Sequence, residues 1–158
     1  QASAISVCTM KHLRNDLYAL VALAAVLAAC GGANELSSEI RCVSAGTREE
    51  VCVSTHLSQP VNLHEPVAQT VTITTRADSD SILVWVESNG RTAVVYDGPT
   101  EFRISTKAGE PTTVTAYLRI DTVGFFTFNA RAEIEGVTDA ALTGLTVEMT
   151  QEGGTVTP

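Results

Sequence analysis

A cysteine at position 30 stands in a sequence context that has a specific chemistry. Leu27, Ala28 and Ala29 precede Cys30, and two glycines follow it. Small side chains let a backbone lie extended in the narrow groove of a peptidase, and a cysteine thiolate is a soft nucleophile that can form a thioether. Residues of these types in this order therefore combine a backbone that a peptidase could bind with a nucleophile that could be alkylated.

The segment before this cysteine has the features of an export signal. Lys11 and Arg14 precede an apolar run over 17–29, which is too short for the roughly 20 residues that cross a bilayer. The whole segment resembles the lipobox signal peptide of bacterial lipoprotein precursors. That resemblance implies that residues 1–29 are upstream sequence and leader, and that Cys30 carries a diacylglycerol and a further acyl chain such as palmitate. The alternative is an ordinary secretory signal, which would leave Cys30 a plain thiol.

The resemblance also implies a location. Two acyl chains, at about 0.8 kcal/mol per buried methylene, hold a protein stably on a membrane. Gly31 occupies the position where, by the same resemblance, an aspartate would favour retention in an inner membrane. We therefore expect a lipid-anchored protein of the cell envelope, on the outer membrane if the cell has one and otherwise on the outer face of the cell membrane. Residues 30–40 are small and polar, and predict a flexible tether.

The charge of the chain excludes some partners. It contains 10 Lys and Arg against 18 Asp and Glu, and loss of Lys11, Arg14 and Asp16 with the leader changes the net charge from −8 to −9. Phosphates of nucleic acid and anionic lipid head groups would be repelled. We expect no nucleic-acid partner, and membrane attachment through the acyl chains alone.

Cys42 and Cys52 predict a disulfide. An exported chain meets an oxidising environment, and two paired antiparallel strands can hold cysteines at bonding distance. The spacing is not the Cys-x-x-Cys of redox catalysis, and no second pair of ligands at zinc spacing accompanies them.

Four later segments alternate apolar and polar residues with a period of two, as strands with one buried face do. They are 70–74, 113–120, 126–134 and 145–150. Short strands separated by Gly, Pro, Asn and Asp predict an all-β fold, an antiparallel sandwich, over residues 41–152, with 153–158 as a C-terminal tail.

A hairpin is the strongest local prediction. Asn89-Gly90 favours a two-residue type I′ turn between strands at 81–88 and 91–96, which would put Trp85 opposite Val94. Both faces of this hairpin would be apolar. One face must meet the core, and the other is either covered by the chain or left for a partner.

From residue 50 to 152 the chain resembles the immunoglobulin-like sandwiches of bacterial surface proteins. The resemblance makes Trp85 the core tryptophan of the third strand and 121–130 the approach to the sixth. Phe126 and Phe128 replace the tyrosine and cysteine of antibody-type domains, so that corner hydrogen bond and inter-sheet disulfide are absent. A turn at 122–124 would pair the flanking strands as a hairpin, whereas the immunoglobulin-like interpretation sends them to opposite sheets.

Few residues offer catalysis or metal binding. His56 and His64, with Glu65, lack a third ligand at short spacing. Asp78 and Asp80, with Asp139, are weak calcium candidates whose ordinary alternative is an acidic turn. Outward Tyr117 and Phe125 would offer a minor sugar-stacking platform.

These observations predict a non-enzymatic protein without a cofactor other than the covalent lipid on Cys30. We expect its single immunoglobulin-like domain to act as a binding or assembly module for a protein partner in the envelope. The alternative is a structural spacer of a larger surface complex, and a carbohydrate- or calcium-binding module is a further one.

Overall fold

The computed structural model describes residues 37–45, 49–137 and 139–158. In these ranges the chain forms ten strands and no helix, and therefore no helix that could span a membrane. The strands are β1 (Arg41–Ala45), β2 (Glu49–Leu57), β3 (Pro66–Thr75), β4 (Ser79–Ser88), β5 (Val94–Asp97), β6 (Glu101–Thr106), β7 (Thr112–Ile120), β8 (Gly124–Ile134), β9 (Ala140–Thr150) and β10 (Gly153–Thr157).

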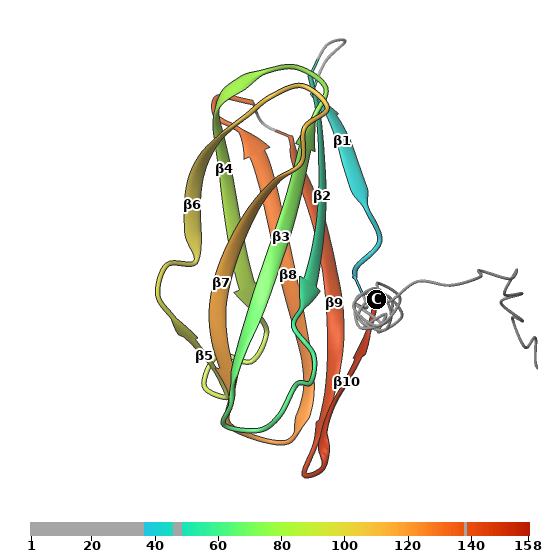
Figure 1. Ribbon diagram of the computed structural model, residues 1–158, viewed down its shortest axis with the longest axis vertical. Coiled ribbons are helices and arrows are strands. Elements are labelled where there is room, and N and C mark those ends of the chain that lie inside the picture. The colour runs from blue at the N-terminus through green and yellow to red at the C-terminus, as the bar shows by residue number, and fades with distance from the viewer. Residues whose placement is uncertain (1–36, 46–48, 138) are drawn as a thin grey trace, which may run out of the picture. The chain divides into compact units, whose positions relative to one another are not determined.

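Two five-stranded sheets account for these strands (Figure 1). The order is β1-β2-β3-β7-β5 in the first sheet and β10-β9-β8-β4-β6 in the second, and all neighbours are antiparallel. Apolar side chains from both sheets meet between them, because alternate residues of each strand point inward. The predicted all-β antiparallel fold is confirmed.

The inward residues are those that the alternation predicts. Every second residue of β7 and of most of β9 is buried, and Phe128, Ala130 and Ala132 are fully enclosed on β8. The core forms two apolar clusters, and Tyr96 packs against both. The sequence pattern alone thus identifies most of the core.

A polar group lies inside this core. Gln69 on β3 is 0% exposed, and its Oε1 accepts a hydrogen bond of 2.9 Å from the Tyr96 hydroxyl. Its Nε2 lies 3.3 Å from both the Thr55 Oγ1 and the Asn129 carbonyl oxygen. Because each of these bonds reaches a different strand, Gln69 fixes the relative positions of β2, β3, β5 and β8.

The predicted Asn89-Gly90 hairpin is wrong. β4 pairs with β8 and β6 in the second sheet, whereas β5 pairs with β7 in the first. With neighbours on both edges, β4 has no free edge left for residues 91–96. Trp85 therefore faces Arg131 and Glu101 across the ladders and not Val94.

Local bonds show how the chain leaves the sheet here. Asn89 stays with β8, because its amide and its Oδ1 bond the Thr127 backbone at 3.2 and 2.9 Å. The Gly90 carbonyl then accepts from the amides of Ala93 and Val94, which forms a tight turn. A Cβ on Gly90 would lie 2.7 Å from Phe126, so the glycine is required by close packing and not by a type I′ turn.

Trp85 also differs from its expected place in the core. Ile82, Val84 and Val86 are the inward residues of β4, and the intervening Leu83 and Trp85 point outward and are half-buried. Both alternating sets of residues in this strand are apolar, so the sequence pattern could not show which set faces the core.

Three connections complete the fold. β7 and β8 lie in different sheets, so the turn at 122–124 crosses between sheets and does not close a hairpin. Residues expected as a tail form β10, which pairs with β9. At the other end, residues 37 and 38 of the expected tether are docked on β2. Ser37 forms an antiparallel β-bridge with His56, and the Ser38 amide donates to the Thr55 carbonyl.

Candidate functional site

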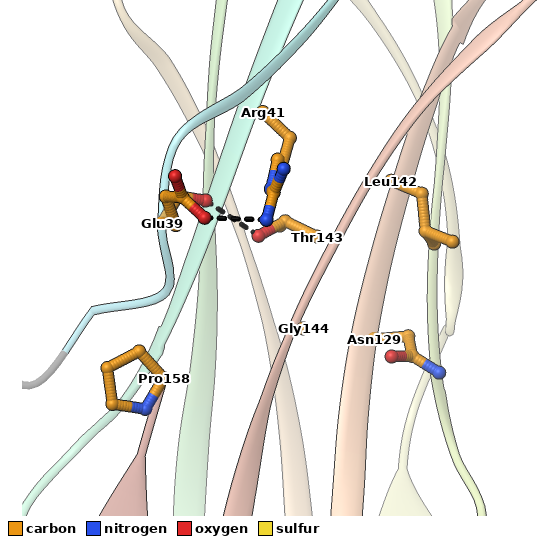
Figure 2. A pocket seen from close by; sticks show the side chains of 7 residues that line it. All are labelled: Glu39, Arg41, Asn129, Leu142, Thr143, Gly144 and Pro158. Atoms are coloured by element: carbon orange, nitrogen blue, oxygen red, sulfur yellow. Dashed lines mark hydrogen bonds and ion pairs between the residues drawn. The ribbon is translucent and has the colours of Figure 1, made fainter.

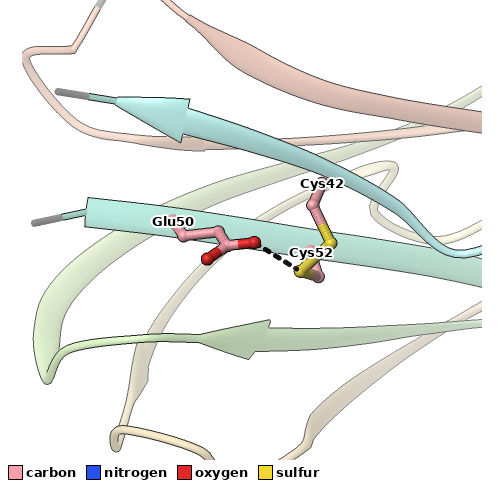
Figure 3. A group of neighbouring side chains, drawn as sticks. All are labelled: Cys42, Glu50 and Cys52. Atoms are coloured by element: carbon pink, nitrogen blue, oxygen red, sulfur yellow. Dashed lines mark hydrogen bonds between the residues drawn. A yellow bond between two sulfur atoms is a disulfide. The ribbon is translucent and has the colours of Figure 1, made fainter. Parts of the chain in front are cut away.

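The predicted cysteine pair is joined. Cys42 and Cys52 lie opposite each other on β1 and β2, with their Cα atoms 4.0 Å apart, and form a disulfide (Figure 3). A Glu50 oxygen lies 3.9 Å from the Cys52 sulfur. Among the described residues, this trio is the sole group of three potential metal ligands whose ligand atoms lie within 4.8 Å of one another, but both sulfurs are committed to the disulfide. Cys30 lies outside the described residues, so its lipidation stays a prediction.

The histidines are not brought together. His56 lies on β2, and His64 lies in the loop before β3 in a left-handed conformation, with φ of 63°. The His64 Nδ1 contacts Asp121 at 3.3 Å, and Arg119 donates hydrogen bonds from two nitrogens to the same carboxylate. Hydrogen bonds from Arg119 lower the pKa of Asp121, against partial desolvation, so this cluster is an exposed ion-pair network.

The weak calcium candidates do not converge either. Asp78, Asp80 and Asp139 are exposed, and no such carboxylate trio occurs among the potential ligand groups in the described part of the chain. Asp78 accepts a hydrogen bond of 2.9 Å from the Ala108 amide, which makes it a loop-closing residue.

Tyr117 and Phe125 are both exposed but do not form one platform. Tyr117 is 56% exposed on β7 in the first sheet, and Phe125 is 68% exposed on β8 in the second. Their outward side chains lie on opposite faces of the sandwich. Tyr117 instead lines a separate hollow of about 310 Å³ with Val95 and Arg119.

The outer face of the second sheet carries aromatic, charged and polar side chains on neighbouring strands. Across β4, β8 and β9 the register aligns two rows, Trp85 with Arg131 and Leu142, and Glu87 with Asn129 and Gly144. We call these six residues the Trp85 face. It joins an indole and an exposed leucine to a guanidinium, an amide and a carboxylate, and thus offers an apolar surface beside hydrogen-bond donors and acceptors.

Arg131 is held in place on this face, and Asn129 has space above a glycine. The Arg131 guanidinium lies over the Trp85 ring at 5.2 Å from its centroid, and donates to Glu133 at 2.7 Å. The Asn129 side chain lies over Gly144, where a Cβ would come within 2.5 Å of its Oδ1. Gly144 therefore leaves space for the Asn129 amide, and the ion pair and indole orient Arg131.

Hollows lie on both sides of the Trp85 face. One, of about 360 Å³, is lined by Trp85, Val86, Glu87, Thr100 and Arg131. The other is an open groove of about 520 Å³ at β9. Figure 2 shows its lining residues, Glu39, Arg41, Asn129, Leu142, Thr143, Gly144 and Pro158.

The wall of the larger groove is tied to the sheet. Thr143 donates to the Glu39 carbonyl oxygen at 2.8 Å, and Glu39 pairs with Arg41 at 2.6 Å (Figure 2). The docked segment therefore contributes to the groove directly.

Sequence reasoning missed this face, apart from noting that one side of the Trp85 strand could remain open. The alternation of 126–134 does put Asn129 and Arg131 on the polar side of their strand. That β8 and not 91–96 lies beside Trp85 required the sheet order.

Comparison with known proteins adds no assignment, since neither any protein-family model nor any curated protein matches this chain.

Proposed function

We propose that this protein is a lipid-anchored component of a bacterial envelope whose immunoglobulin-like sandwich binds a ligand through the Trp85 face. The observation that carries the binding role is the position of the chain's single tryptophan. Its ring lies on the outside of the sheet beneath Arg131 and lines the hollow of about 360 Å³. Core packing gives no reason for that arrangement, whereas a binding surface does.

The strand order supports the immunoglobulin-like interpretation. With β2, β3 and β7 taken as strands A, B and E, and β4, β8 and β9 as C, F and G, both sheets have the expected neighbours. β5 and β6 follow in reversed chain order, and β1 and β10 extend the sheets, so the topology is a variant of that family's.

The anchor rests on the lipobox resemblance, and the disulfide is in keeping with export. Since the domain is already docked at Ser37, only six residues, 31–36, separate Cys30 from it, and the seven steps from Cys30 to Ser37 span at most about 25 Å. The Trp85 face would therefore act close to the membrane surface.

Lipidation is tested by growing the native bacterium, or a bacterial host, with an alkyne analogue of palmitate. We expect the label on the wild type and on Cys8→Ala, but not on Cys30→Ala. Intact mass should show a mature chain that begins at Cys30 and carries the acyl groups. An unlabelled wild type, or a mature chain with a free terminal thiol, would refute the anchor.

A binding module is distinguished from a spacer by photo-crosslinking in cells. A benzophenone amino acid at Leu142 on the Trp85 face should give a specific adduct that Arg131→Ala removes. The matched position is Thr115, which is exposed on the first sheet. Equal adducts at both positions, unaffected by Arg131→Ala, would favour the spacer.

A further inference from the structure

The groups on the Trp85 face match one ligand chemistry better than others. Arg131 donates hydrogen bonds, Glu87 accepts them, and Asn129 does both. Leu142, which is 56% exposed, supplies apolar surface beside them, and the half-buried Trp85 ring lies beneath Arg131. A sugar has the same mixture, because each hydroxyl both donates and accepts and the ring carbons form apolar patches.

Other ligand classes fit less well. A cation would compete with Arg131, which already lies on the indole at 5.2 Å. An anion would meet Glu87 and Glu101 on an acidic chain of net charge −8. A purely apolar ligand would leave the guanidinium and the carboxylate desolvated without partners. A neutral polyol avoids all three penalties.

The face is prepared for such a ligand before it arrives. Glu133 and the Trp85 ring hold Arg131, and the glycine at 144 leaves room for the Asn129 amide. The Arg131 guanidinium, which is already oriented, loses little freedom on binding, and this favours recognition of weakly binding hydroxyls.

The dimensions set a minimum ligand length. β4, β8 and β9 are consecutive neighbours, so their outward residues extend over roughly 10 Å at about 4.8 Å per strand. That distance corresponds to about two sugar rings, and the hollows of about 360 and 520 Å³ give room at either end.

We propose that the Trp85 face binds a neutral oligosaccharide of at least two sugar units. This inference rests on the proposed binding role of that face and specifies its ligand class. Arg131, which lies over the Trp85 ring, would contact one sugar ring, and Asn129 and Leu142 would contact the next.

The single tryptophan makes a direct assay possible. The full-length lipidated protein, in detergent micelles, is titrated with cellohexaose, maltohexaose and the hexamer of N-acetylglucosamine while Trp85 emission is recorded. We expect at least one hexamer to change the emission saturably and to bind at least tenfold more tightly than its monosaccharide. No saturable change with any of the three would overturn the inference.

Variants localise the binding. Arg131→Ala and Asn129→Ala should each lower the affinity for the responding hexamer by tenfold or more, and Glu87→Gln should lower that affinity less. Arg119→Ala, on the first sheet, is the matched control and should bind as the wild type does. Circular dichroism confirms that each variant is folded. Unchanged affinity in folded Arg131→Ala and Asn129→Ala would also overturn the inference.

The two proposals can fail separately. A protein adduct at Leu142 that depends on Arg131, together with no response to the hexamers, would refute the oligosaccharide and keep the binding role. Absence of any adduct at Leu142 together with no sugar response would refute both.

Discussion

The environment of Trp85 depends on which of the two alternating sets of residues in its strand faces the core. Residues 82–86 are apolar at every position, so either Ile82, Val84 and Val86 or Leu83 and Trp85 could face the core. The structure buries the first set, and Trp85 stays half-buried under Arg131. A single residue's role therefore follows from which neighbours its strand acquires.

An outward Trp85 should contribute little to stability. We expect Trp85→Ala to lower the free energy of unfolding by less than about 2 kcal/mol, because it leaves no internal cavity. Phe128→Ala, at a site with 0% exposure, should cost about 3–5 kcal/mol. Urea unfolding followed by circular dichroism measures both, and equal losses would mean that the indole is a core residue.

Tyr96 should make the fold sensitive to alkali. Burial, and secondarily the charge of Glu87, raises the pKa of Tyr96 well above its ordinary value. In the unfolded chain the phenol ionises near pH 10, so this contribution is complete below that pH and declines as the pH rises above it. Unfolding free energies at pH 8 and 11 should show the loss. Tyr96→Phe should reduce it, and Tyr117→Phe, at an exposed site, should not.

At the scale of elements, one edge strand of each sheet is joined to its neighbour by a local link, a disulfide in the first sheet and a hairpin in the second. The disulfide joins the edge strand β1 to β2, and the β9–β10 hairpin closes one side of the second sheet. The turn at 122–124 sends β8 across to that sheet, so the pairing of each long strand depends on residues far away in sequence.

The disulfide should stabilise the domain measurably. It links residues separated by 10 positions, and a loop of that size is worth about 2.5–3 kcal/mol in the chain-entropy model. We expect the double variant Cys42→Ser/Cys52→Ser to lose about this amount in urea unfolding. Adding a reductant should lower the free energy of unfolding of the wild type but not that of the double variant. A double variant as stable as the oxidised wild type would contradict the prediction.

At the scale of the whole molecule, the segment at 37–40 connects the domain to the predicted anchor. Ser38 is 3% exposed and contacts both sheets, because its hydroxyl accepts from the Thr55 amide at 2.8 Å and donates to the Thr143 Oγ1 at 2.9 Å, while Thr143 donates to Glu39. The point at which the domain begins is therefore fixed between the two layers.

Breaking this contact should loosen the junction. Thr143→Val removes both hydrogen bonds of the Thr143 hydroxyl. We expect the free energy of unfolding to fall by about 1–3 kcal/mol and proteolysis at 37–41 to become faster. Thr146→Val, farther along β9, is the matched control. Unchanged cleavage in Thr143→Val would show that the segment docks independently of β9.

The sequence by itself determined the all-β class of the fold, most of the buried residues and the cysteine pair. These features depend on period-two alternation and on local chain geometry, which neighbouring residues express directly. Residues 126–132 illustrate this, since their apolar positions are the buried ones. The expectations for Cys30 are also local, and they stay predictions.

The tertiary structure alone decided which strands are neighbours, and with them the candidate site. Asn89-Gly90 favours a hairpin locally, but contacts of β4 with β8 and β6 outweigh a turn preference of a few residues. The Trp85 face assembles residues from 85 to 144 in the chain. No local pattern encodes their proximity, because it results from burying two apolar sheet faces against each other.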